Sequence, residues 1–409
     1  MNLLRPLMIC LLGASATLVA TRAEAIELVT RDDGTRFAFT GYAQPYFRWV
    51  DNPCSARLTD ADTVDCNRTT VPDGFGLQNA RLVFEGDWET RGRMNLEIAT
   101  VPNVELVEVE FAFEPVSNLL LRVGRIRVPF ARQALTSESK MQFVGRTDSL
   151  KYTPGRQLGA AIRYEPTIGG SPWFGLDLGV FNGESSEERA PINNIDEQFL
   201  VAARVRVSPL GERVPLSEGD LRAPGERSRL LLELGATTSY ESRGENNGNY
   251  EDRRTSADVA ALYRGASLYA QAVLVDRDFR ADDVDPDFTA TGFSVQVGYF
   301  APLPWVERHL ELAGRYEVFD PSAATDASRD ADLRAPQAGS GPARPEGSQA
   351  RSILTGGVNL YLQGHDLKLQ LNYIHREELE DWVGSAQSPG LLKRSVDDDA
   401  AFAQMTWRM

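Results

Sequence analysis

The stretch Leu230-Leu231-Leu232-Glu233-Leu234-Gly235-Ala236-Thr237-Thr238-Ser239-Tyr240 changes character at every second residue. Leucine, alanine, threonine and tyrosine occupy the even positions, and Glu233 and Thr237 lie between them. Successive side chains of a β-strand point to opposite faces, so this pattern predicts a strand with one apolar and one polar face.

The same period of two recurs along the chain, and no stretch of comparable length shows the spacing of an amphipathic helix. The sequence therefore predicts an all-β protein. Its sixteen expected strands cover residues 36–50, 75–88, 91–100, 105–114, 119–127, 156–165, 173–182, 197–207, 228–241, 255–264, 266–276, 289–301, 308–319, 350–362, 367–377 and 399–409.

The connections between these strands alternate between short and long. Most connections that follow an even-numbered strand are short, and most that follow an odd-numbered strand are long, including 51–74, 128–155 and 320–349. There are two exceptions. The connection 101–104 is short although it follows an odd-numbered strand, and 208–228 is long although it follows an even-numbered strand. Short periplasmic turns and long outer loops are typical of outer-membrane barrels. We therefore expect a 16-stranded antiparallel transmembrane β-barrel, closed so that no strand edge faces hydrocarbon.

Composition excludes several other classes. The chain has 409 residues, of which 42% are hydrophobic and 25% charged, so collagen, coiled coil and wholesale disorder are excluded. The net charge of −15 argues against nonspecific nucleic-acid binding. After residue 25 no apolar run reaches the ~18 residues of a membrane-spanning helix, so a helical-bundle membrane protein is excluded.

Residues 1–25 have the features of a secretory signal peptide. Arg5 supplies a positive charge, an apolar region follows, and Ala23-Glu24-Ala25 fits a cleavage site. The mature chain, residues 26–409, would then form the barrel and be integral to the cell outer membrane.

Two cysteines remain in that chain, Cys54 and Cys66, both in the predicted first outer loop, 51–74. An exported protein meets an oxidising compartment, which favours a local disulfide between them, with two free thiols as the alternative. A zinc site is disfavoured because no histidine lies near and two thiolates do not close a zinc shell.

Four motifs carry a resemblance to a known family. They are Phe75-Gly76-Leu77-Gln78-Asn79-Ala80-Arg81-Leu82 with Phe84-Glu85-Gly86, then Leu121-Arg122-Val123-Gly124-Arg125-Ile126-Arg127-Val128-Pro129-Phe130, then Gly179-Val180-Phe181-Asn182-Gly183, and Ala202-Ala203-Arg204-Val205. In order and spacing the chain resembles the phosphate-selective porin O and P family over nearly its whole mature length. The resemblance implies a homotrimer whose third loop, 128–155, folds inward as the constriction loop. It also implies that arginines and lysines on the wall and at the constriction conduct anions, phosphate among them.

The charge of that segment agrees with an anion-preferring constriction. Residues 125–156 hold seven basic and two acidic side chains, a local balance of 7 − 2 = +5. Fixed cations in a narrow pore attract anions, and the guanidinium fork matches phosphate oxygens. The predicted anion-binding residues of the constriction are Arg125, Arg127, Arg132, Lys140, Arg146, Lys151 and Arg156, opposed by Glu138 and Asp148.

The predicted lumen wall is closer to electrical balance. Alternation points Arg81, Arg93, Arg163, Arg204, Arg206, Arg315 and Lys368 inward, together with a similar number of carboxylates, among them Glu97, Glu108, Glu110, Glu233, Asp258 and Glu311. The degree of phosphate selectivity therefore stays open.

No catalytic motif accompanies these features. His309, His365 and His375 lie in different segments, and no G-x-S-x-G, H-E-x-x-H, C-x-x-C or P-loop occurs. We expect no enzyme, cofactor or metal, but passive diffusion of small hydrophilic solutes with a preference for phosphate-like anions. Outer-membrane lipid and lipopolysaccharide would surround the barrel. A weakly selective general or sugar porin, and a non-conducting structural or adhesin barrel, are the alternatives.

Overall fold

The computed structural model describes residues 25–51, 56–58, 64–66, 73–88, 91–167, 169–183, 197–223, 225–243, 250–279, 288–302, 306, 308–323, 350–379, 382–383, 392–393 and 398–409. The predicted signal peptide and Cys54 lie outside these residues. Cys66 lies in a short strand whose side chains are not described, so the disulfide stays a prediction. No helix of the described chain is long and apolar enough to cross a membrane.

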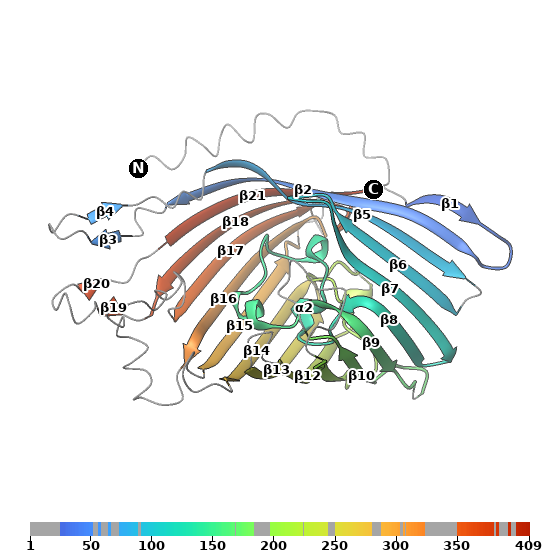
Figure 1. Ribbon diagram of the computed structural model, residues 1–409. Coiled ribbons are helices and arrows are strands. Elements are labelled where there is room, and N and C mark those ends of the chain that lie inside the picture. The colour runs from blue at the N-terminus through green and yellow to red at the C-terminus, as the bar shows by residue number, and fades with distance from the viewer. Residues whose placement is uncertain are drawn as a thin grey trace.

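Sixteen antiparallel strands of the described chain close into a barrel (Figure 1). Closure occurs at β2, which pairs with β5 along one edge and with β21 along the other. The strands are β2 (Arg36–Asp51), β5 (Gly74–Trp88), β6 (Gly92–Ala99), β7 (Glu105–Val116), β8 (Leu119–Arg127), β9 (Arg156–Tyr164), β10 (Phe174–Phe181), β11 (Leu200–Val207), β12 (Leu231–Ser242), β13 (Tyr250–Tyr263), β14 (Ala266–Phe279), β15 (Phe288–Phe300), β16 (Leu310–Ala323), β17 (Arg351–Tyr361), β18 (Leu367–Glu378) and β21 (Asp398–Arg408).

These strands confirm the sixteen predicted from alternation, with differences only at their ends. The largest difference is in β13, which begins at Tyr250 rather than at residue 255. The extension includes Arg253 and Arg254, whose charges conceal the alternation in the sequence. Two small hairpins lie outside the barrel, β3 (Ala56–Leu58) with β4 (Val64–Cys66) and β19 (Trp382–Val383) with β20 (Leu392–Lys393).

One further strand, β1 (Ile26–Thr30), was not predicted. It pairs with residues 36–39 of β2, beyond the point where β21 stops pairing at Tyr42. The hairpin between β1 and β2 turns at Gly34, whose φ of 86° favours glycine. β1 therefore covers backbone groups of β2 that the closing strand leaves unpaired.

Strand β12, which contains most of the 230–240 stretch, shows which face of the barrel wall meets the lipid. In β12, Leu234, Ala236 and Tyr240 are exposed, whereas Glu233 and Thr237 between them are buried inside the barrel. Because apolar side chains point outward and polar ones inward, the hydrophobic effect places this wall in a bilayer.

The strand connections define the two ends of the barrel. We call the end with the long connections the loop end and the other the turn end. Residues 128–155 leave β8 at the loop end and run inside the ring of strands, where α2 (Arg132–Leu135) forms a single helical turn (Figure 1).

Candidate functional site

The constriction loop, residues 128–155, is held against one side of the lumen by apolar packing. Phe130, Ala131 and Leu150 of the loop pack against Val273 and Val275 of β14 and against Ala290 of β15. All six residues are buried, so this contact excludes water between the loop and the wall.

Polar side chains of the wall bind the backbone of the loop tip. The Lys368 ammonium donates to the Met141 carbonyl at 2.5 Å, and the Val144 amide donates to Asn372 at 2.7 Å. Neutral amides make most of the remaining contacts, and amide contacts are not weakened by salt as exposed ion pairs are. They are Gln370 and Asn359 to the Gln142 carbonyl, at 2.8 and 2.9 Å, and Gln78 to the Val144 carbonyl at 3.0 Å.

Several predicted pore cations are buried and hold the loop instead of facing open lumen. Arg132 pairs with Glu233 at 2.7 Å, and their side chains are 5% and 2% exposed. Arg204 contacts both oxygens of Asp258, at 2.6 and 2.9 Å, and donates to the Phe130 carbonyl at 2.7 Å. Desolvated charges of this kind need their partners and are not available to a permeating ion.

Six other predicted cations lie outside the cluster that is described below. Arg315 is buried and donates to the Gly145 carbonyl, and Arg206 is buried beside Asp177 and Glu165, with Arg163 also on Asp177. Arg125 contacts Glu105 and the Leu106 carbonyl on β7, Lys151 is 59% exposed beside Asp148, and Arg93 is exposed on β6.

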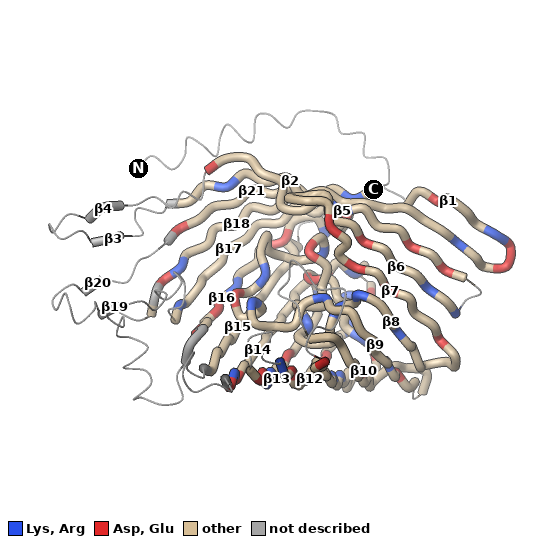
Figure 2. Tube along the Cα trace, viewed as in Figure 1, with Lys and Arg blue, Asp and Glu red and all other residues tan. Residues whose placement is uncertain are grey.

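Four predicted arginines are brought together with three glutamates between the loop and the wall of β5 to β9. We call these residues the arginine–glutamate cluster: Arg81, Arg127, Arg146, Arg156, Glu97, Glu108 and Glu138. Arg81 contacts Glu97 at 2.6 Å and Glu138 of the loop at 2.8 Å. Four positive and three negative charges leave the cluster at +1. Figure 2 shows both signs of charge inside the ring of strands.

The rest of the cluster connects β7, β8 and β9 with the loop. Arg156 contacts Glu108 at 2.9 Å and Glu97 at 3.4 Å. Arg127 lies 3.5 Å from Glu108 and donates to the Leu135 carbonyl at 2.7 Å. Since Leu135 belongs to the loop 128–155, these contacts place the cluster inside the barrel against the loop.

Exposure shows where the lumen is open. Arg146 and Glu138 are 24% and 28% exposed, in contrast to the buried pairs on the β12 side. Residues of β5 are partly exposed almost throughout, whereas the inward residues of β12 are buried. Charged side chains inside the barrel are therefore more exposed where the loop meets β5 to β9 than along β12, and the lumen region beside them is the more open one. We call it the conduit.

Two charged residues of the loop have shifted pKa values. Burial acts to raise the pKa of Glu138, but Arg81 and Arg146 outweigh it and hold the pKa below its usual value. Burial, aided by Arg408, lowers the pKa of Lys140. The carboxylates of Asp366 and Glu85 act in the opposite direction, to raise this pKa. Among the described residues, no three or more His, Cys, Asp or Glu side chains are grouped as a metal site would need.

Sequence reasoning missed the neutral side chains that hold the loop, such as Gln370 and Asn359, because a polar residue facing the lumen has no distinctive spacing. It also missed the role of residues 208–230, although the sequence showed that this connection is unusually long for the turn end of the barrel.

Comparison with known proteins agrees with this architecture. The family profile described as phosphate-selective porin O and P matches residues 58–382. An uncharacterized protein of Aquifex aeolicus (strain VF5) is 23% identical over 294 residues, which are 68% of this chain and 64% of that protein.

Two solved structures share the fold. OmpT of Vibrio cholerae in its trimer form has a TM-score of 0.53 at 10% identity, covering 91% of this chain and 99% of that one. The anion-selective porin from Comamonas acidovorans has a TM-score of 0.53 at 13% identity, covering 92% of this chain and 100% of that one. Together with the closed barrel and its inward loop, the family match over residues 58–382 shows that the chain belongs to the phosphate-selective porin O and P family and is an integral porin of the outer membrane.

Proposed function

We propose that this porin passes small hydrophilic solutes passively through the conduit and prefers anions, phosphate among them. The observation that carries the proposal is the +1 charge of the arginine–glutamate cluster on the open side of the lumen. Lys140 adds a cation on the same loop. A guanidinium that keeps one N–H pointing into water can exchange a carboxylate contact for a phosphate oxygen.

The preference is expected to be modest because most of the positive charge is compensated. One unit charge about 7 Å from a permeating ion contributes about 0.6 kcal/mol in water. Anions gain this free energy and cations lose it, so the permeability ratio changes roughly eightfold at low ionic strength, and less when salt screens the charge. The balance of arginines and glutamates favours a weakly selective general porin as the second candidate.

The test is electrical measurement of the purified protein in planar bilayers. A discrete conductance step is expected, and its absence would favour a sealed barrel. In a tenfold gradient of KCl the reversal potential should lie toward that of chloride, and phosphate should reduce the chloride current. A reversal potential near zero would instead support the general porin.

Paired variants test whether the loop carries the preference. Lys140→Gln should shift the reversal potential toward zero. Arg229→Gln, which removes a side chain that is 75% exposed and paired with Glu212 at the turn end, should not. Equal shifts in the two variants would assign the preference to overall charge instead of the constriction.

The homotrimer, and contacts with outer-membrane lipid and lipopolysaccharide, belong to the same proposal. The family and the trimeric form of OmpT support the homotrimer. The apolar outer face of strands such as β12 supports lipid contact.

A further inference from the structure

The connection between β11 and β12, residues 208–230, enters the barrel from the turn end, opposite to the constriction loop. Val214 of this segment packs with Leu231, Ala260, Leu262 and Tyr269 inside the barrel. Farther along, Glu218 and Asp220 are buried although both are acidic. A buried carboxylate is stable only when its oxygens accept hydrogen bonds, so the partners of Glu218 show what this segment does.

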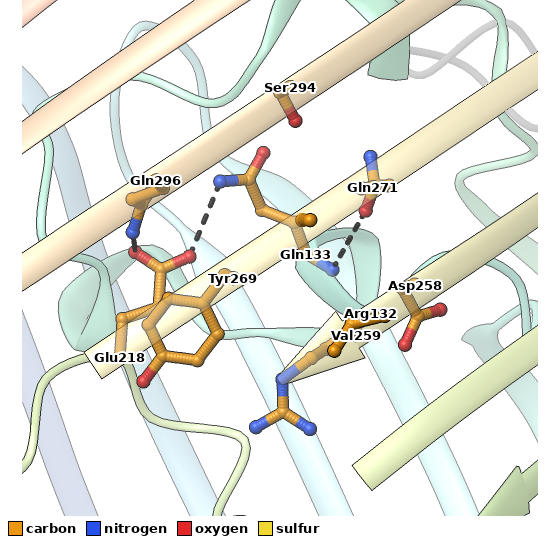
Figure 3. A pocket seen from close by; sticks show the side chains of 10 residues that line it. Arg132, Gln133, Glu218, Asp258, Val259, Tyr269, Gln271, Ser294 and Gln296 are labelled. Carbon is orange, nitrogen blue, oxygen red and sulfur yellow. Dashed lines mark hydrogen bonds between the residues drawn. The ribbon is translucent and has the colours of Figure 1, made fainter. Parts of the chain in front are cut away.

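Glu218 joins the segment to the constriction loop (Figure 3). Its carboxylate accepts a hydrogen bond from the backbone amide of Gln142 in the loop at 2.8 Å and another from the side-chain amide of Gln133 at 3.3 Å. It also accepts the Gln296 side chain of β15 at 2.8 Å, which ties both segments to the wall. The Glu218 backbone amide donates to the Lys140 carbonyl at 2.9 Å.

The Glu218 side chain is supported by the backbone next to it. The Glu218 carbonyl contacts His365 Nε2 at 2.9 Å, and the Gly219 amide donates to the Tyr269 hydroxyl at 3.0 Å. Gly219 has a φ of 83°, and a Cβ added there would lie 3.0 Å from a carboxylate oxygen of Glu311. Glycine at this position therefore lets the chain turn directly against the wall.

A second contact reinforces the junction. Arg132 of the constriction loop, already paired with Glu233, also donates to the Val214 and Pro215 carbonyls. The loop is thus held from two directions, by apolar packing on β14 and β15 and by residues 208–230.

We propose that residues 208–230 act as a brace for the constriction loop and that Glu218 is the positioning residue that keeps the loop tip from moving farther into the conduit. The brace and the loop together contact the inner wall from β12 to β18. If the Glu218 contacts are lost, the loop tip keeps its contacts to Lys368 and Asn372 but loses its support from the turn end, and we expect it to move more often into the conduit. The consequence for transport rests on the proposed pore function, whereas the position of the loop does not.

The first measurement is single-channel recording of Glu218→Ala in planar bilayers. Transient closures should become at least threefold more frequent as the loop tip enters the conduit. The matched control is Glu212→Ala in the same segment, where the exposed side chain contacts Arg229 and not the loop, and closures should stay at the wild-type rate. Wild-type closure kinetics in Glu218→Ala would overturn the proposal.

The second measurement reports loop position without current. Ser139→Cys, at a buried position in the loop tip, is introduced with Cys54→Ser and Cys66→Ser and treated with a water-soluble thiol reagent. Labelling should be at least tenfold faster with Glu218→Ala than with Glu218 intact, and an unchanged rate would overturn the brace.

Glu218→Gln keeps the side-chain volume and is used if the alanine variant does not fold. It should show a smaller increase in both readouts, because the NH2 group of the glutamine faces a hydrogen-bond donor where a carboxylate oxygen accepted before. No increase would again overturn the proposal. A channel without anion preference that still shows both effects would refute the proposed selectivity and leave the brace intact.

Discussion

Glu138→Gln should make the channel more anion-selective. Glu138 is the carboxylate that the constriction loop contributes to the arginine–glutamate cluster, at 2.8 Å from Arg81 and 3.8 Å from Arg146. Glutamine keeps the shape and removes one negative charge, so the cluster changes from +1 to +2. The loop should stay in place because Arg81 keeps Glu97 at 2.6 Å and Arg146 keeps the Thr136 carbonyl at 2.8 Å.

The size of the effect follows from Coulomb's law. With about 7 Å between the carboxylate and a permeating ion, one charge changes the free energy by about 0.6 kcal/mol in water. Since anions and cations respond in opposite directions, the permeability ratio rises roughly fivefold at 0.01 M salt, where the Debye length is ~30 Å. At 0.1 M, where the Debye length is ~10 Å, the expected increase is roughly threefold.

Reversal potentials in KCl gradients at the two ionic strengths give this ratio, with the exposed Glu212→Gln as control. An increase that does not depend on salt, or an equal increase in the control, would refute the electrostatic reasoning.

The pH dependence gives an independent check. Because Arg81 and Arg146 hold the pKa of Glu138 below its usual value despite burial, the carboxylate stays ionised as the pH falls from 8 to 5. The difference between wild type and Glu138→Gln should persist over this range and disappear only in stronger acid, as Glu138 is protonated. A difference already lost at pH 5 would contradict the lowered pKa.

Arg127→Ala should reduce the anion preference because the Arg127 guanidinium belongs to the cluster. Arg132→Ala should mainly lower the free energy of unfolding, by about 3–5 kcal/mol, because it leaves Glu233 buried without its counter-charge. Equal shifts of the reversal potential in these two variants would contradict the placement of the two arginines. Arg204→Met should cost about as much for the same reason, and Arg204→Met with Asp258→Leu should recover most of the loss. Urea unfolding in detergent, followed by tryptophan fluorescence, measures both effects, and a double variant no more stable than Arg204→Met alone would contradict the argument.

Much of the fold could be predicted from sequence because a transmembrane strand is a local pattern. Alternation in the 230–240 stretch depends only on which face meets lipid, and it located β12 within a few residues. The same pattern elsewhere in the chain located the other fifteen strands. β1 escaped prediction because its exposed residues 26–30 carry no such constraint. Its strand conformation comes from the unpaired edge of β2, which exists only after the barrel closes.

The candidate site could be predicted only in part. The sequence identified the loop 128–155 and its excess of basic residues, but it treated Arg132 and Arg156 alike. The structure separates them, because Arg132 packs beside Glu233 out of reach of lumen water, whereas Arg156 belongs to the cluster. Which carboxylate lies beside which arginine depends on strand register and on the path of the loop, and neither is encoded in spacing.

By itself the sequence determined a strand-built cylinder with an apolar outside, because every strand must present an apolar face to lipid and the strands must pair in a closed ring to satisfy their backbone groups. The tertiary structure alone decided which side of the lumen stays open and which charges face it. Those properties depend on contacts between segments far apart in the chain, such as Glu138 with Arg81 and Glu218 with Gln142, where burial and pairing cancel most of the charge that a count along the sequence would assign to the pore.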